Sequence, residues 1–137
     1  MFEDEKLLKY FTEDEFRRSS FCLPGETALA SQIQQDPLSL LDWPTLKMLD
    51  QTRDYAGCPF QISCSYRSRA WDVSKGRSGN SSHTKGFAFD VEARTDHRRF
   101  LILRAAILCG WNRIGVAKTF IHLDNDPGLT RQVVWTY

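Results

Sequence analysis

The sequence predicts an α+β fold, with N-terminal helices packed on a small antiparallel sheet. Two observations lead to this prediction. Before residue 57, helix-capping residues and apolar residues spaced three or four apart are typical of short helices. After residue 60, several stretches alternate apolar and polar residues, as strands with one buried face do. Helices followed by strands in one chain favour the α+β class over the alternating α/β class.

Three helices are expected in the N-terminal part. Thr12 and Glu15 form a capping box that begins a short helix. A second helix is expected over 26–35, where it stops before a proline. The third begins with Trp43, followed by a proline that suits a first helical turn, and it ends at Gly57.

Two strands follow these helices. In 60–66, strict alternation directs Cys64 toward the core and Ser65 away from it. In 87–91, Asp90 lies in a row of small residues that includes a glycine and an alanine. We expect this row to leave room for a metal and for a substrate backbone.

One helix and three more strands complete the chain. A loop rich in Ser, Gly, Lys and Arg is expected over 72–82. Thr95 caps an apolar helix over 96–109, which Gly110 ends. The last strands are expected over 112–117, 119–124 and 131–136. Together these elements fit one domain, 1–137.

The charge balance argues against a protein that binds nucleic acid. The chain has 18 basic and 17 acidic residues, a formal net charge of +1. A protein that grips a polyphosphate normally carries a clear basic excess. One local basic cluster, within 67–77, keeps a structural or nucleic-acid-associated protein as an alternative.

The sequence gives no sign of export or membrane insertion. Residues 1–6 are largely charged and do not resemble a signal peptide. No segment approaches the ~18 apolar residues of a membrane span. We therefore expect a monomer made in the cytoplasm, with no membrane or nucleic-acid partner and with reduced cysteines. Three tryptophans could line a groove, although burial in the core is the favoured interpretation: Trp71, Trp111 and Trp135.

Three residues have the chemistry of a metal site. His83 and His122 lie where strands can bring them to the face that carries Asp90. Two imidazoles and a carboxylate leave a fourth tetrahedral position open, as in catalytic zinc sites. We predict one Zn²⁺ per chain. By spacing alone, ordinary surface or core residues are the competing interpretation, and the third histidine, His97, is expected to lie on the surface.

A longer pattern favours the metal site. The segment 81–90, Ser-Ser-His-Thr-Lys-Gly-Phe-Ala-Phe-Asp, fits Ser-x-His-x-x-Gly-x-Ala-x-Asp. Together with His-Leu-Asp at 122–124, it closely resembles the zinc D-Ala-D-Ala carboxypeptidase family, metallopeptidase family fifteen, of the hedgehog/DD-peptidase fold. Ser-Tyr-Arg-Ser at 65–68 is similar to the family's Gly-Tyr-Arg-Ser element. The segment 10–16 resembles the start of its short single-domain branch, so the resemblance spans about 10–136.

The resemblance implies roles for individual residues. His83, Asp90 and His122 become the zinc ligands, and Arg67 becomes the residue that binds a substrate carboxylate or carbonyl. Zinc polarises the scissile carbonyl and lowers the pKa of a water from about 15.7 to near 7. Ser81, outside any Gly-x-Ser-x-Gly elbow, is expected to bind substrate by hydrogen bonds and not to act as a nucleophile.

The substrates of the family imply peptidoglycan stem or cross-link peptides that contain D-amino acids. Carboxypeptidase and endopeptidase activity both remain open. A small chain of this kind also resembles a phage or virus enzyme that lyses the host cell wall, or a bacterial protein of phage origin.

The sequence departs from the family at the proton-transfer residue. Many members place Glu or Asp three residues before the second histidine, where this chain has Thr119. Asp124 is the first candidate for the general base, and an equal alternative is that it orients a histidine. Glu92 is a weaker candidate for the base. The same departure keeps a second function open, a zinc-bearing module that binds peptidoglycan or protein without turnover.

Overall fold

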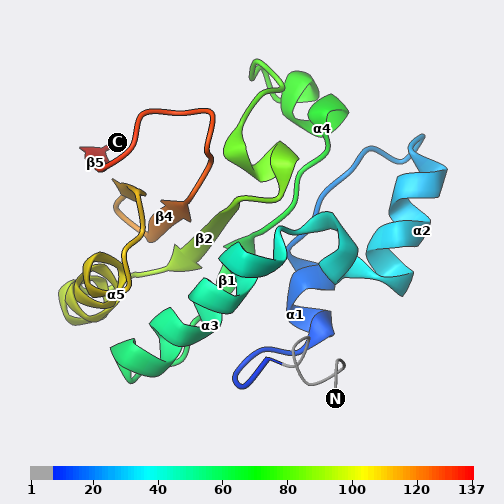
Figure 1. Cartoon of the computed structure of the whole chain (residues 1–137). Coiled ribbons are helices and arrows are strands. Elements are labelled where there is room, and N and C mark those ends of the chain that lie inside the picture. The colour runs from blue at the N-terminus through cyan, green and yellow to red at the C-terminus, as the bar shows by residue number, and fades with distance from the viewer. Residues whose placement is uncertain (1–7) are drawn as a thin grey trace.

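The computed structural model describes residues 8–137. The segment 1–6, which was compared with a signal peptide above, lies outside these residues. The helices and strands expected from the sequence follow in the expected order, with additional short helical segments between them (Figure 1). The helical elements are α1 (Glu13–Arg18), α2 (Thr27–Gln35), η2 (Pro37–Leu40), α3 (Trp43–Ala56), α4 (Arg69–Ser74), η3 (Ser82–Lys85) and α5 (Asp96–Leu108). The strands are β1 (Ile62–Cys64), β2 (Ala88–Glu92), β3 (Arg113–Val116), β4 (Phe120–Asp124) and β5 (Val133–Thr136).

The strands form one sheet with the order β1-β2-β4-β3-β5. All neighbouring pairs are antiparallel except β3 and β5, which are parallel. The parallel pair was not expected from the sequence. After β4 the chain crosses β3, and β5 then pairs with the far edge of β3 and runs in the same direction as β3. The α+β class is confirmed, and the arrangement is compatible with the hedgehog/DD-peptidase fold.

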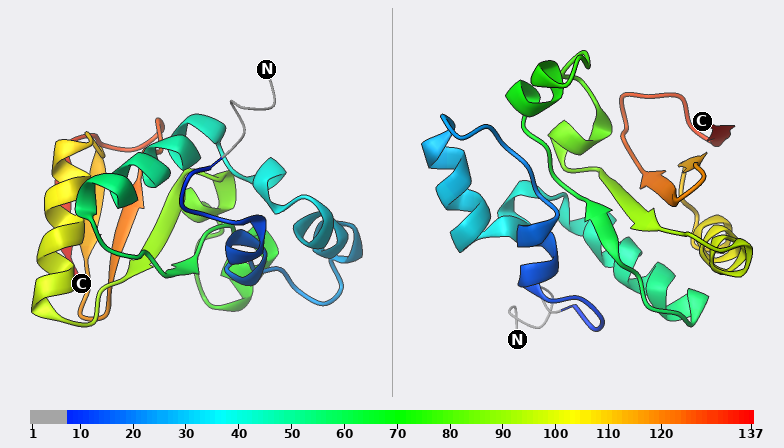
Figure 2. Two further views of the ribbon diagram at one scale, coloured as in Figure 1. Left: turned by 90° about the horizontal axis from the view of Figure 1, so that it is seen from below. Right: turned by 180° about the vertical axis from the view of Figure 1, so that it is seen from behind.

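Two long helices cover one face of the sheet. In Figure 2, α3 and α5 lie side by side against the strands, whereas α1 and α2 lie beyond β1. The buried apolar residues of the sheet and these helices form one cluster, which is the core. Its fully buried large members are Phe16, Leu46, Leu49, Phe89, Val91, Ile102, Ile121 and Leu123. The opposite face of the sheet is therefore left for polar residues. Within residues 8–137, every helix is too short or too polar to cross a bilayer.

Local signals explain where the helices begin. The capping box is present, with the backbone N–H of Thr12 donating to Glu15 Oε2 at 2.8 Å. The side chain of Asp42 caps α3, and that of Thr95 caps α5. Each cap satisfies a backbone N–H that the first helical turn leaves unpaired.

Two expectations were wrong for the segment 60–82. The predicted loop over 72–82 is helical in part, because α4 runs through Ser74 and η3 begins at Ser82. Ser68 caps α4, and the ring of Trp71 stacks on Phe21 at 5.3 Å, so packing stabilises a helix that the Ser- and Gly-rich composition concealed.

The alternation expected over 60–66 is also broken. Ile62 pairs with Val91 and Cys64 with Asp90, so the register shifts between them as in a β-bulge. Ser65, expected to face away from the core, is fully buried. The bulge thus turns the backbone of Ser65 inward, beside the polar face of the sheet.

Candidate metal centre and active-site cleft

One residue from each strand lies in a single row across the sheet. Asp90 on β2 pairs with Cys64 on β1 and with His122 on β4. Gly115 on β3 pairs with His122 and with Trp135 on β5. Directly opposed residues share a face of the sheet, so this row collects a carboxylate, an imidazole and an indole on the side away from the core.

The three residues predicted as metal ligands meet at one carboxylate oxygen. Oδ1 of Asp90 lies 3.3 Å from Nε2 of His83 and 2.9 Å from Nδ1 of His122. The centroids of the two imidazole rings are 5.1 Å apart. His83 comes from η3, whose C-terminal Gly86 redirects the chain into β2. The structure therefore brings these three donors together, and their role as zinc ligands stays a prediction.

Both histidines use their second ring nitrogen as a donor to protein oxygen. Nδ1 of His83 donates to the carbonyl oxygen of Ser65 at 2.7 Å. Nε2 of His122 donates to Oδ2 of Asp124 at 2.6 Å. Histidines that bind zinc almost always make such a second bond, which fixes the tautomer and the ring orientation. The donor chemistry of these residues therefore fits zinc.

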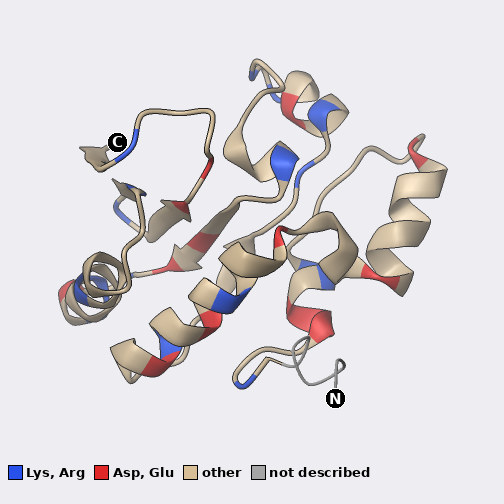
Figure 3. Ribbon diagram, in the orientation of Figure 1, with Lys and Arg blue, Asp and Glu red and all other residues tan. Residues whose placement is uncertain are grey.

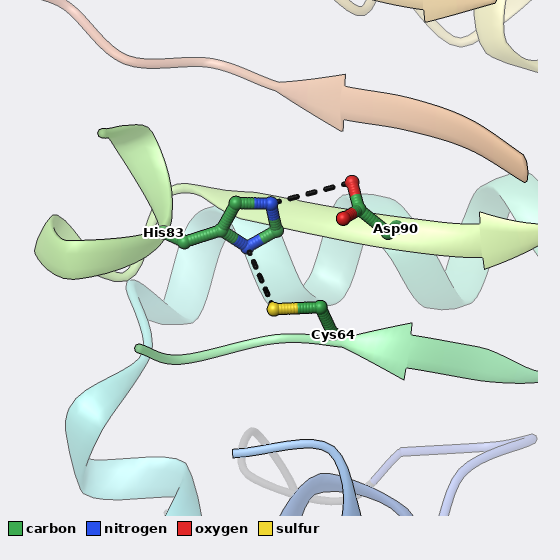
Figure 4. A group of neighbouring side chains, drawn as sticks. All are labelled: Cys64, His83 and Asp90. Carbon is green, nitrogen blue, oxygen red and sulfur yellow. Dashed lines mark hydrogen bonds and ion pairs between the residues drawn. The ribbon is translucent and has the colours of Figure 1, made fainter. Parts of the chain in front are cut away.

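Cys64 is a further donor close to the site. The ligand atoms of Cys64, His83 and Asp90 lie within 4.8 Å of one another. Figure 4 shows, however, that Cys64 and Asp90 approach opposite nitrogens of the His83 ring. Sγ lies 3.6 Å from Nδ1, which Ser65 already occupies. In the metal-free protein, burial also raises the pKa of the Cys64 thiol to about 12.

The groups around Asp90 and His122 shift the pKa values of both residues, so that each is held in its charged form. Burial alone would raise the pKa of Asp90, but His83 and His122 hold it well below its usual range. Burial alone would lower the pKa of His122, but hydrogen bonds to Asp124 and Asp90 raise it to about 9. In the absence of metal, His122 is therefore an imidazolium between two carboxylates at neutral pH. A divalent cation at this point replaces a proton with a stronger positive charge.

Asp124 is held on both of its oxygens. It is 1% exposed; Oδ2 accepts from His122, and Oδ1 lies 3.0 Å from Nε of Arg113. Oδ1 also accepts from the backbone N–H of Asp126 at 3.1 Å. Of the two roles predicted for Asp124, this geometry favours the one that orients His122.

The centre lies in a cleft of about 480 Å³. Arginines and serines from the segments around α4 and η3 line it, as do Arg113 and the aromatic residues of the C-terminal part of the chain. The residues that line the cleft are Arg67, Arg77, Ser81, Ser82, His83, Asp90, Arg113, Phe120, His122, Asp124, Leu129, Trp135 and Tyr137. The cleft therefore joins the candidate ligands to both residues predicted to bind substrate, Arg67 and Ser81.

Arg67 is fixed by a buried carboxylate. Its Nε lies 3.0 Å from Oδ1 of Asp72, which is fully buried in α4. Ser81 donates to Oδ2 of the same carboxylate at 2.6 Å and accepts from Nη2 of Arg67 at 3.3 Å. Ser81 thus bridges the two charged groups at the edge of the cleft, and the guanidinium keeps donors for a ligand.

Comparison with known families agrees with this arrangement. The model of the family described as Peptidase M15 matches residues 9–124, which include all three candidate ligands. The chain belongs to the peptidase M15 family. The M15 family consists of zinc-dependent metallopeptidases. No curated protein matched the chain.

Other residues named from the sequence lie away from the centre of this M15 peptidase. Glu92 pairs with Arg94 at 3.5 Å and faces a separate small pocket with Gln61. Thr119 is exposed in the turn before β4, and His97 is exposed on α5. Within residues 8–137, the carboxylates that line the cleft are therefore Asp90 and Asp124 alone.

The small residues beside Asp90 have a different use from the one expected. A Cβ on Gly86 would lie 2.4 Å from the carbonyl oxygen of Leu40, at a φ of +81°. Gly86 therefore allows η3 to pack on the backbone before α3, and the space it leaves is not open to a ligand. Ala88 is fully buried. The room expected beside Asp90 is not provided by either residue.

Several cleft residues of this M15 peptidase had escaped the sequence reasoning. Trp135, for which the core was the favoured interpretation, lines the cleft, the alternative considered for it, with its ring 5.5 Å from the His122 ring and 5.0 Å from the guanidinium carbon of Arg113. Trp111 is buried in the core as expected. Arg113 lies directly opposite Asp124 on the neighbouring strand, so antiparallel pairing of β3 with β4 could have placed it beside that carboxylate. Arg77 was noted only as part of the basic cluster within 67–77, and nothing local in the sequence marks Asp72.

Proposed function

We propose that this M15 peptidase hydrolyses peptidoglycan stem or cross-link peptides that contain D-amino acids, with one zinc ion held by His83, Asp90 and His122. The observation that carries the proposal is the convergence of two histidines on Oδ1 of Asp90, at 3.3 and 2.9 Å. Each histidine also has its other nitrogen engaged by protein oxygen. This arrangement supports a three-ligand site with one open coordination position.

The protein residues have distinct tasks in the proposed reaction. When bound, zinc polarises the scissile carbonyl and makes a water molecule acidic enough to attack near neutral pH. His83, Asp90 and His122 hold the ion, and Asp124 keeps the His122 ring in the orientation that directs Nδ1 toward it. Arg67 lies at the edge of the same cleft, where its guanidinium is suited to a substrate carboxylate or carbonyl.

The shape and chemistry of the cleft support a peptide substrate. Its volume, about 480 Å³, is within the usual range for small-ligand sites, roughly 300–1,000 Å³. Trp135 and Tyr137 form an aromatic side, while Arg67 and Ser81 form a polar side. The resemblance in the sequence supplies the class of peptide. A substrate in the cell wall fits our further proposal that the protein serves a phage, a virus or a phage-derived bacterial gene in cell-wall lysis.

One observation favours a second function, a zinc-bearing binding module without turnover. The family's usual acidic residue is replaced by Thr119, and the oxygens of Asp124 are engaged by His122 and Arg113. A peptidase normally needs a group that carries a proton to the leaving amine. The module would bind the same peptides in the same cleft and leave them intact.

The deciding experiment combines metal analysis with mass spectrometry of digested peptidoglycan. We expect one zinc per chain, new peptide termini after digestion, and loss of both after chelation. The variant His122→Gln should lose zinc and activity together, whereas the exposed His97→Gln, the matched control, should keep both. One bound zinc without any new termini favours the binding module. A chain that binds no zinc contradicts both functions.

A further inference from the structure

Asp72 is a fully buried carboxylate that the proposed reaction does not use. It lies in α4, outside the row of candidate ligands, and its side chain is 0% exposed. Three side chains reach it from the cleft: Arg67, Arg77 and Ser81, at 3.0, 3.7 and 2.6 Å. A buried carboxylate is costly unless it is paired, so Asp72 ties these three residues to one fixed point.

The charges around Asp72 do not cancel. Elsewhere in the cleft, two carboxylates, Asp90 and Asp124, face the charged groups of His122 and Arg113. At Asp72, two guanidinium groups share a single carboxylate, which leaves one positive charge uncompensated. Figure 3 shows the corresponding cluster of Lys and Arg positions on α4 and the adjoining loop. If Arg67 stood alone, Asp72 would neutralise it, so the excess charge of the cleft depends on Arg77.

The loop after α4 holds Arg77 in this position. The backbone N–H of Arg77 donates to the carbonyl oxygen of Asp72 at 2.9 Å. Gly76 and Gly79, at φ of +82° and +85°, fold the loop back. At Gly79 a Cβ would lie 2.9 Å from Cγ of Arg69, so the loop packs against α4. The Arg77 side chain is 48% exposed and lines the cleft, so it is anchored at one end and open to a ligand at the other.

We propose that Arg77 is a specificity-determining residue, the second guanidinium of a subsite that binds a substrate carboxylate beside Arg67. The inference rests on the proposed function and narrows its substrate class to peptides with a free carboxylate near the scissile bond. Two guanidiniums on one buried carboxylate offer charge-assisted hydrogen bonds and one net positive charge, which matches one carboxylate. A peptide whose terminal carboxylate is converted to an amide lacks that partner.

The test measures binding and therefore needs no turnover. The probe is a peptide that ends in D-alanyl-D-alanine, as the free acid and as the C-terminal amide, titrated calorimetrically into the metal-free protein. We expect the wild type to bind the acid roughly tenfold more tightly than the amide, and Arg77→Gln to lose most of that preference. Arg77→Lys, which keeps the charge without the planar fork, should retain part of it.

Arg69→Gln is the matched control. Arg69 is the first residue of α4, donates to the side chain of Asn80 at 3.0 Å and does not line the cleft, so its removal should leave the preference intact. Equal preference for the acid in Arg77→Gln and in the wild type overturns the inference, as does a wild type that binds acid and amide equally. Failure of the proposed function looks different, because the zinc-loaded protein then leaves peptides intact while the binding preference persists.

Discussion

Asp124 holds His122 by a short hydrogen bond, 2.6 Å from Oδ2 to Nε2. The other carboxylate oxygen lies 3.0 Å from Nε of Arg113, whose guanidinium stacks against Trp135. Asp124, itself paired with Arg113, therefore holds the His122 imidazole through Nε2, and the Nδ1 of the ring is directed toward Asp90. This relationship favours orientation of the ligand over proton transfer as the role of Asp124.

The first prediction concerns the variant Asp124→Asn. Loss of a carboxylate that orients a zinc histidine typically lowers metal affinity about 10- to 100-fold. We expect a fall of that size in a competition with a chromogenic chelator, with peptidase activity restored by excess zinc. Glu92→Gln, which changes a carboxylate outside the cleft, is the control and should leave zinc affinity unchanged. If Asp124 were the general base instead, Asp124→Asn would keep its zinc affinity and lose kcat.

The arrangement of the strands explains why the metal donors could be predicted from the sequence. Period-two alternation placed Asp90 and His122 on one face of their strands, and antiparallel pairing then put them opposite one another. Strand alternation could not place the side chain of His83, because His83 lies in η3 and not on a strand. Only the longer motif linked it to Asp90. The sequence thus predicts the set of donors that the structure brings together.

Features that depend on contacts between distant segments could not be predicted in the same way. The bulge that buries Ser65 follows from the pairing of β1 with β2, and without it no carbonyl faces His83. Asp72 looks like an exposed residue in a polar segment, since charged side chains are seldom fully buried. Its burial results from the two arginines and the serine that fold over it from the segments before and after α4.

The second prediction concerns pH. In the metal-free protein the pKa of His122 is raised to about 9, against roughly 6.5 in the unfolded chain. The imidazolium therefore contributes stability that is fully present below pH 6.5 and is lost as pH rises through 9, of order 3 kcal/mol at one pKa unit per 1.36 kcal/mol. We expect the denaturation midpoint to fall over that interval, as measured by chemical denaturation in the presence of a chelator.

Two variants separate His122 from other titrating groups. His122→Gln should remove most of the pH dependence between 6.5 and 9, although the variant is less stable throughout. His97→Gln, at an exposed position on α5, should follow the wild type. An unchanged slope in His122→Gln assigns the pH dependence to another residue and contradicts the prediction.

The third prediction distinguishes the two sets of possible ligands. Cys64 approaches Nδ1 of His83, the nitrogen that already donates to Ser65, and burial raises the pKa of its thiol to about 12. We therefore expect Cys64→Ala to retain one zinc per chain, measured by elemental analysis after dialysis. It should also be slightly destabilised, because the substitution removes a buried sulfur. Loss of zinc in Cys64→Ala, with zinc retained in His122→Gln, would identify Cys64 as a ligand in place of His122.

The last prediction concerns Gly115, which lies between His122 and Trp135 in the row across the sheet. A Cβ at this position would lie 2.6 Å from Cε2 of Trp135, closer than side-chain atoms approach. Gly115→Ala should therefore displace the indole from His122 and Arg113, at a cost of about 1–3 kcal/mol in unfolding free energy, as overpacking does. The displacement is measured by the indole N–H resonance of Trp135.

Gly25→Ala is the control for Gly115→Ala, because a Cβ at Gly25 meets no atom within 4 Å. It should leave both the Trp135 resonance and the stability unchanged. Since the indole packs on His122 at 5.5 Å, we also expect Gly115→Ala to weaken zinc binding. A Gly115→Ala protein with native stability and an unshifted indole resonance would contradict the prediction, because the indole would then have kept its place beside His122.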